Sequence, residues 1–148
     1  MDIKSLKLLK IQYDLTIDEL DKLLFKRMSE EEKKWTYQLS QQVPNESIID
    51  DYEVVHDILI ADDDTKKNLE HMLNRLDLVF KVYDISDIYI NHPNILGDKL
   101  VEDIDNFVKN SIILDDVLDR INEVGFENIN TFEKKFLKFQ DGNDIKNP

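Results

Sequence analysis

The sequence predicts an α+β domain in which amphipathic helices pack on a small mixed sheet of three or four strands. Residues 52–61 and 78–90 are rich in β-branched residues, which favour strands. Between these two runs, four apolar residues recur at helical spacing: Leu69, Met72, Leu73 and Leu76. Strands joined through a helix usually lie parallel with a right-handed crossover, so the sheet needs at least one further strand.

Residues 5–15 are the candidate for that further strand. Apolar Leu9, Ile11, Tyr13 and Leu15 alternate with polar residues, as in a half-buried strand. An all-helical N-terminus is the alternative, because Leu6 and Leu9 also suit the start of a helix. With the strand, the element order fits a ferredoxin-like arrangement of the sheet.

Helix starts are marked by short polar side chains that can accept a free backbone N–H. Thr16 and Glu19 form one capping box and Ser29 and Glu32 another. We therefore expect a helix after Thr16 and then either a new helix or a bend in the same one at Ser29, ending at Pro44. Asp64 or Thr65 is expected to cap the helix that carries Leu69. Residues 86–87 predict a break or bulge within the strand over residues 78–90.

The C-terminal part of the sequence is helical in pattern. After a turn at residues 91–94, we expect a helix over residues 97–110, and then a helical pair over residues 113–139. Gly125 should close the first helix of the pair in the left-handed conformation, with Phe126 packing back on Ile121. Asn130 should cap the second helix, which turns Phe132 and Phe136 inward. The predicted division is an α+β domain over 1–110, a helical pair over 111–140 and a polar tail over 141–148.

A resemblance is confined to this helical pair. The run LDDVLDRI is followed by Gly125, Phe126, an apolar Ile129, a cap at Asn130 and the run EKKFL. Residues 114–139 thereby resemble a short C-terminal helical segment of Bacteroidota proteins, such as the tails of rhomboid-family proteases. In that segment Glu usually stands where this chain has Phe132. The resemblance implies an interaction module of bacterial origin and carries no catalytic residue.

Composition excludes several classes of protein. The 148 residues contain no cysteine, so disulfides, thiolate metal sites and cysteine nucleophiles are excluded. Hydrophobic residues make up 41% of the chain, which is enough for a core. No apolar run reaches the ~20 residues of a membrane span, and no signal-peptide pattern opens the sequence. We therefore expect a cytoplasmic protein that does not bind membranes.

Negative charge is concentrated in one block of the sequence. The net charge is −13, yet residues 1–34 hold equal numbers of acids and bases. No Lys or Arg lies between Trp35 and Thr65, where eight acidic residues occur: Glu46, Asp50, Asp51, Glu53, Asp57, Asp62, Asp63 and Asp64. Such a block repels phosphate, which argues against direct nucleic-acid binding, and attracts basic proteins. The alternative interpretation is a solvated, solubilising face.

Patterns that carry chemistry are weak. Residues 58–64, ILIADDD, resemble the first strand of response-regulator receivers, in which acids hold Mg²⁺, but the later strands with a phosphoacceptor Asp, a Thr or Ser and a Lys are missing. His56, His71 and His92 show no metal-ligand spacing, and three glycines build no phosphate-binding loop. We therefore expect no enzyme, no catalytic residues, no cofactor and no metal. A metal-dependent site at Asp62–Asp64 is the open alternative.

The functional prediction is a non-enzymatic acidic protein that binds a basic protein partner, as immunity proteins, antitoxins and anti-defence inhibitors do. The alternative is a structural or adaptor subunit of a phage or bacterial assembly, with possible self-association through apolar surface. The predicted partner-binding residues are Glu46, Asp50, Asp51, Glu53, Asp57, Phe132 and Phe136.

Overall fold

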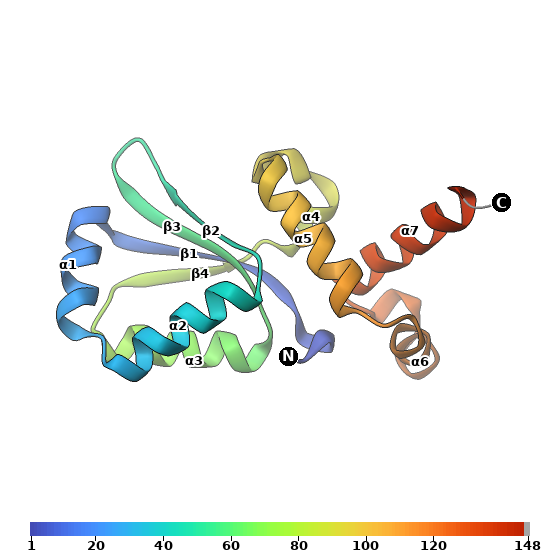
Figure 1. Ribbon diagram of the computed structural model, residues 1–148, viewed down its shortest axis with the longest axis horizontal. Helices are drawn as coiled ribbons and strands as arrows, with labels where there is room; N and C mark the ends of the chain where they lie inside the picture. Colours follow the sequence, from blue (N-terminus) through green and yellow to red (C-terminus); the bar gives the residue numbers. More distant parts are fainter. Residues whose placement is uncertain (147–148) are drawn as a thin grey trace. The chain divides into compact units, whose positions relative to one another are not determined.

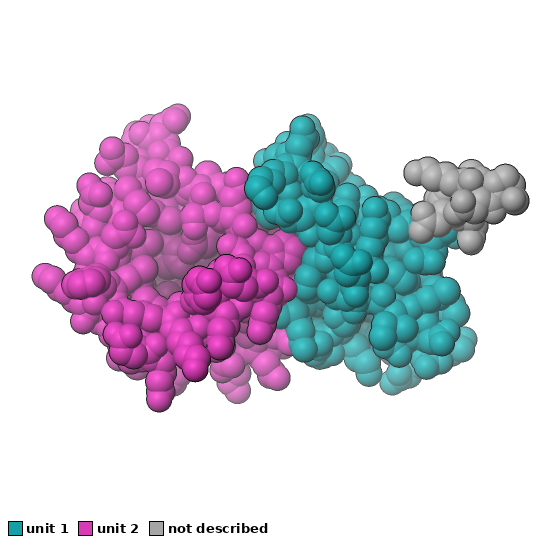
Figure 2. Space-filling view, viewed as in Figure 1, with its two compact units in different colours: residues 1–6, 86–148 teal, residues 7–85 magenta. Residues whose placement is uncertain are grey.

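The computed structural model describes the backbone of residues 1–146 and the side chains of residues 1–141. The chain forms two compact units: unit 1 comprises residues 1–6 and 86–148, and unit 2 comprises residues 7–85 (Figure 2). The sequence predicted a division after residue 110 instead. Residues 86–110 therefore group with the C-terminal helices.

Unit 2 contains a four-stranded open sheet with three helices (Figure 1). Its elements are β1 (Lys7–Thr16), α1 (Ile17–Arg27), α2 (Glu30–Gln42), β2 (Asn45–Ile49), β3 (Val54–Ala61), α3 (Asp63–Arg75) and β4 (Phe80–Asp84). The strand order is β2-β3-β1-β4, and every neighbouring pair is antiparallel. The α+β class, the number of strands and the N-terminal strand are thereby confirmed.

The expected mixed sheet is wrong, because β1 lies between the two strands that α3 joins. Strands β3 and β4 both run antiparallel to β1, so they point in the same direction, as expected. They are not neighbours, however, and no parallel pair forms. The crossover through α3 passes over β1 rather than placing β4 beside β3.

Strand β2 was not predicted from the sequence. It forms a hairpin with β3, in which Asn45 pairs with Leu59 and Ile49 pairs with Val55. All five of its residues are exposed. An exposed edge strand needs no alternation of apolar and polar residues, so it leaves no hydrophobic period in the sequence.

The predicted helix caps of unit 2 are largely confirmed. The Thr16 hydroxyl accepts the Glu19 N–H at 3.4 Å, and Ser29 and Glu32 form a reciprocal capping box. The cap of α3 is Asp62 rather than Asp64 or Thr65, and its carboxylate accepts the Thr65 N–H at 2.8 Å. Because Asp62 is buried, its capping role also explains how this acid is tolerated there.

Unit 1 is helical. Its elements are η1 (Ile3–Ser5), α4 (Ser86–Asn91), η2 (Pro93–Leu96), α5 (Asp98–Ser111), α6 (Leu114–Val124), η3 (Phe126–Asn128) and α7 (Thr131–Lys146). The strand expected up to residue 90 is wrong, because it ends at Asp84 and α4 follows. Helix α4 buries Tyr89 completely, with its ring stacked on Phe132 at a centroid distance of 5.8 Å. Tertiary packing therefore overrides the β-branched composition of this segment.

The C-terminal helical pair is partly as expected. Asn130 and Glu133 form a reciprocal cap at the start of α7, with bonds of 2.8 and 3.1 Å. The left-handed helical conformation expected at Gly125 is wrong, since φ is +86° but ψ is 153°. Phe126 does not pack back as expected, because it begins η3 and remains 55% exposed. Of the predicted polar tail, residues 147–148 lie outside the described residues.

Among the described residues, no helix combines the length and the apolar character needed to cross a bilayer.

Candidate functional site

The acidic block of the sequence is divided among several places in unit 2. Asp50, Asp51 and Glu53 form the turn between β2 and β3, while Asp57 lies within β3. Glu46 lies on β2 opposite Ile58, so alternation directs it to the other face of the sheet from Asp57. The five predicted acids therefore do not form one contact surface.

Asp50 organises the hairpin turn. Its Oδ1 accepts the backbone N–H groups of Tyr52 and Val54 at 2.8 and 3.0 Å. Its Oδ2 lies 3.1 Å from Nε2 of His56. The hydrogen bond with His56, together with these backbone bonds, lowers the pKa of Asp50 below its usual range. Asp50 is thus a charged residue whose main contacts are internal.

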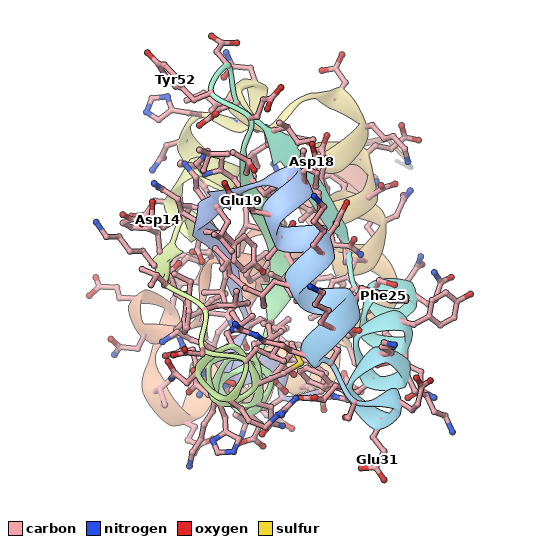
Figure 3. The ribbon with its side chains drawn as sticks, turned by 90° about the vertical axis from the view of Figure 1, so that its left-hand side faces the viewer. Asp14, Asp18, Glu19, Phe25, Glu31 and Tyr52 are labelled. Carbon is pink, nitrogen blue, oxygen red and sulfur yellow. The ribbon has the colours of Figure 1, made fainter. Side chains whose placement is uncertain are left out.

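The neighbouring acids come from the end of β1 and the start of α1. The backbone N–H of Ile17 donates to the carbonyl of Glu53 at 3.0 Å, which ties the start of α1 to the hairpin turn. Figure 3 shows Asp14, Asp18, Glu19 and Tyr52 on the end of unit 2 that faces the viewer. We call this surface the acidic end, and it comprises Asp14, Asp18, Glu19, Asp50, Asp51, Tyr52 and Glu53.

Tyr52 is the exposed aromatic residue of the acidic end. It lies at the tip of the hairpin and is 84% exposed (Figure 3). Phe25 on α1 is similarly exposed, at 80%. Exposed aromatic side chains surrounded by charge are the residue types that anchor protein interfaces. The acidic end therefore combines charge with an apolar anchor.

Asp57 belongs to a hydrogen-bonded cluster. The Tyr13 hydroxyl donates to Oδ2 of Asp57 at 2.9 Å, and the Ser47 hydroxyl donates to Oδ1 at 2.5 Å. Ser47 pairs directly with Asp57 across β2 and β3. Burial, followed by the charge and hydrogen bond of Asp57, raises the pKa of Tyr13 far above its ordinary value. Tyr13 therefore remains a protonated donor, and the carboxylate is held as an acceptor.

This cluster borders a cavity of about 230 Å³. Helices α1, α2 and α3 line it together with β1, β2 and β3, and the surface of unit 2 is hollowed between β2 and α2 (Figure 2). Most of its lining is apolar: Ile11, Leu24, Met28, Leu39, Val43, Leu59, Leu69, Met72 and Leu73. Apolar walls with a few fixed polar groups are typical of small-molecule sites.

The structure places the two predicted aromatic contacts inside unit 1. Phe132 is fully buried and Phe136 is 3% exposed. Phe132 stacks on Tyr89, whose hydroxyl donates to Asp105. These residues therefore form core rather than a surface open to a partner.

The aspartate run after β3 serves the start of α3. Asp62 caps the helix, and Asp63 forms an ion pair with Lys7. Within the described part of the chain, no group of three or more His, Cys, Asp or Glu side chains is placed to hold a metal ion.

Comparison with known proteins gives no match to a family model, a curated protein or a solved structure.

Sequence reasoning missed Tyr13, Ser47 and the contribution of α1 to the acidic end. Tyr13 occupies an inward position of the alternating β1 run, where a hydroxyl requires a hydrogen-bond partner, so a signal was present. Ser47 gave none, because β2 itself was not predicted. In the sequence, Glu19 was assigned to a capping box with Thr16, and Asp18 has no signal beyond that of an acid in a first helical turn.

Proposed function

We propose that this protein is a non-enzymatic binding protein that engages a basic protein partner through the acidic end. The observation that carries the proposal is the position of Tyr52, an 84% exposed aromatic side chain between Asp51 and Glu53. The acids of β1 and α1 extend the same surface (Figure 3). Electrostatic attraction would accelerate the encounter, and Tyr52 would supply buried contact area once bound.

The charge of the acidic end favours a protein over a nucleic acid. Surfaces that bind nucleic acids neutralise phosphates with Lys and Arg, whereas none of the seven residues that define the acidic end is basic. The hairpin is also held in shape before binding, because Asp50 closes the turn through three internal contacts. A preformed surface loses little conformational entropy on association. Immunity proteins, antitoxins and anti-defence inhibitors act in this way, by covering a basic partner.

Capture of partners from a lysate of the source organism tests the proposal. The bait is the wild-type protein, and the test variant is Asp51→Lys/Glu53→Lys, which reverses two exposed charges of the hairpin. The matched control is Asp98→Lys/Glu102→Lys, which makes the same change at two exposed acids of α5. We expect a basic protein that the wild type and the control retain and the hairpin variant loses. Equal retention by all three baits would refute the acidic-end proposal.

A second candidate, assembly through α6, rests on a different surface. Ile113, Leu114, Leu118 and Phe126 are 61%, 39%, 45% and 55% exposed in unit 1. Apolar side chains exposed on α6 and next to its two ends favour an adaptor or structural subunit that self-associates or docks on an assembly. Such a contact would persist at high salt, unlike one made by the acidic end. Leu114→Glu/Leu118→Glu should abolish it, as measured by sedimentation velocity.

We also propose a ferredoxin-like arrangement for unit 2. Two features support it: the order strand, helices, strand, strand, helix, strand, and the sheet order β2-β3-β1-β4. In this order each of the two crossovers spans one intervening strand. The test is an experimental structure of unit 2 superposed on ferredoxin-like domains; strands in another order would refute it.

A further inference from the structure

We propose that the cavity of unit 2 binds a small free molecule that carries one ammonium group on an apolar body. The proposal rests on the contrast between the lining of the cavity and the Asp57 carboxylate at its border. It is independent of the acidic end.

The charge of Asp57 favours a cationic ligand. Asp57 is half-buried on β3, and among the residues described around the cavity there is no Lys, Arg or His. Its two hydrogen bonds come from neutral hydroxyl groups, those of Tyr13 and Ser47. A carboxylate next to apolar walls is costly unless a cation compensates it. A ligand with an ammonium group would supply that cation.

The unused hydrogen-bonding capacity of the Asp57 carboxylate favours a ligand that donates a hydrogen bond. A carboxylate offers about four lone-pair positions. Tyr13 and Ser47 occupy two of them and fix the orientation of the group, which leaves room for a donor that enters from the cavity. Because both hydroxyl groups already donate to Asp57, neither proton is directed at the ligand. The side of the cavity at Asp57 therefore selects a donor rather than an acceptor.

The size and shape of the cavity suit a small aromatic ligand. The cavity measures about 230 Å³, while an engineered apolar cavity of about 150 Å³ takes up benzene. An aromatic ring with a short side chain therefore fits, and the volume lies below the roughly 300–1,000 Å³ of pockets that bury drug-sized ligands. Met28 and Met72 contribute flexible thioether side chains to the wall, which adapt to ligands of different shape.

The three methionines of the chain provide the test. Met28 and Met72 line the cavity, whereas Met1 lies in unit 1. The full chain, labelled with ¹³C at the methionine methyl groups, is titrated with 2-phenylethylamine, neutral 2-phenylethanol and anionic 3-phenylpropionate. We expect the amine to shift the Met28 and Met72 signals without moving Met1. It should bind about tenfold more tightly than the alcohol, because a charge-assisted hydrogen bond is stronger than a neutral one.

Two variants test whether Asp57 causes the preference for the amine over the alcohol. Asp57→Asn should bind the amine and the alcohol equally well, while Asp51→Asn at the hairpin turn should behave like the wild type. If Asp57→Asn does not fold, the affinities of the wild type for the three ligands still show whether the cavity prefers an ammonium group. Unshifted Met28 and Met72 signals, or an alcohol that binds as tightly as the amine, would overturn the proposal. Tighter binding of N-acetyl-lysine methylamide than of 2-phenylethylamine would also overturn it, by pointing to the side chain of a protein partner instead.

Discussion

The Tyr13 hydroxyl donates a 2.9 Å hydrogen bond to the Asp57 carboxylate, which joins two neighbouring strands of the sheet through their side chains. Tyr13 is 7% exposed, so its hydroxyl has little access to water. The bond therefore satisfies a buried donor and holds an acidic side chain beside apolar walls. It connects the stability of unit 2 with the proposed selectivity of its cavity.

Removing this hydroxyl should destabilise the fold. We expect Tyr13→Phe to lower the free energy of unfolding by about 1–2 kcal/mol, because a hydrogen bond to a charged group is lost while the ring is kept. Urea unfolding followed by circular dichroism measures the change. Tyr37→Phe, at a 66% exposed position, is the matched control and should change the stability by less than about 0.5 kcal/mol. Equal stabilities of the two variants would show that the bond contributes nothing.

The hairpin turn should depend on pH through Asp50. Its pKa is lowered in the folded protein, so its stabilising effect is complete above the pKa of an unfolded Asp, about 3.9. The effect is lost as the pH falls through the lower, folded value. We expect hydrogen exchange at the Tyr52 and Val54 amides to accelerate in Asp50→Asn at neutral pH, because their acceptor is neutralised. Asp51→Asn is the control, and unchanged protection in Asp50→Asn would contradict this role.

The end of α3 offers a stabilising substitution. Asp77 has a φ of +59°, and the Leu78 N–H donates to the Leu73 carbonyl at 3.1 Å, as in a Schellman ending. Glycine adopts this backbone conformation without the strain of a side chain. We expect Asp77→Gly to raise the free energy of unfolding by about 0.5–1 kcal/mol. Asn74→Gly, inside the same helix, should lower it by a similar amount, and a loss of stability in both variants would refute the argument.

Unit 1 contains a buried carboxylate whose partner can be removed. Glu133 is 2% exposed, and its carboxylate lies 3.4 Å from Nε of Arg120 while also accepting the Asn130 N–H. We expect Arg120→Gln to lower the free energy of unfolding by about 2–3 kcal/mol, because the buried charge loses its cation. Chemical unfolding of the variant measures this loss. Lys138→Gln, at an exposed position, should have no measurable effect on stability. A similar loss of stability in both variants would show that the effect comes from the change in net charge and not from the loss of the cation next to Glu133.

The sequence predicted those parts of the fold that leave a periodic signal. Alternation at Leu9, Ile11 and Tyr13 identified β1, and capping residues located the starts of α1 and α2. Strand β2 was missed because it is short, exposed and unpatterned. Helix α4 was read as strand because its isoleucines favour strands, whereas the burial of Tyr89 against Phe132 is a tertiary effect.

The candidate sites were predictable only in part. The base-free block identified the hairpin acids Asp50, Asp51 and Glu53, but it could not show that Asp14, Asp18 and Glu19 lie on the same end. That proximity depends on the register of β1 with β3. The cavity was invisible in the sequence for a similar reason, because its lining comes from three helices and three strands.

We propose that the acidic end recognises a basic protein. The most direct test is the association rate of the captured partner with the wild type and with Asp51→Lys/Glu53→Lys, each at low and high salt. We expect a fast wild-type rate that falls steeply with salt, and a slow, nearly salt-independent rate for the variant. The control Asp98→Lys/Glu102→Lys should keep the wild-type behaviour. A wild-type rate that does not change with salt, or one that the hairpin variant matches, would contradict the account.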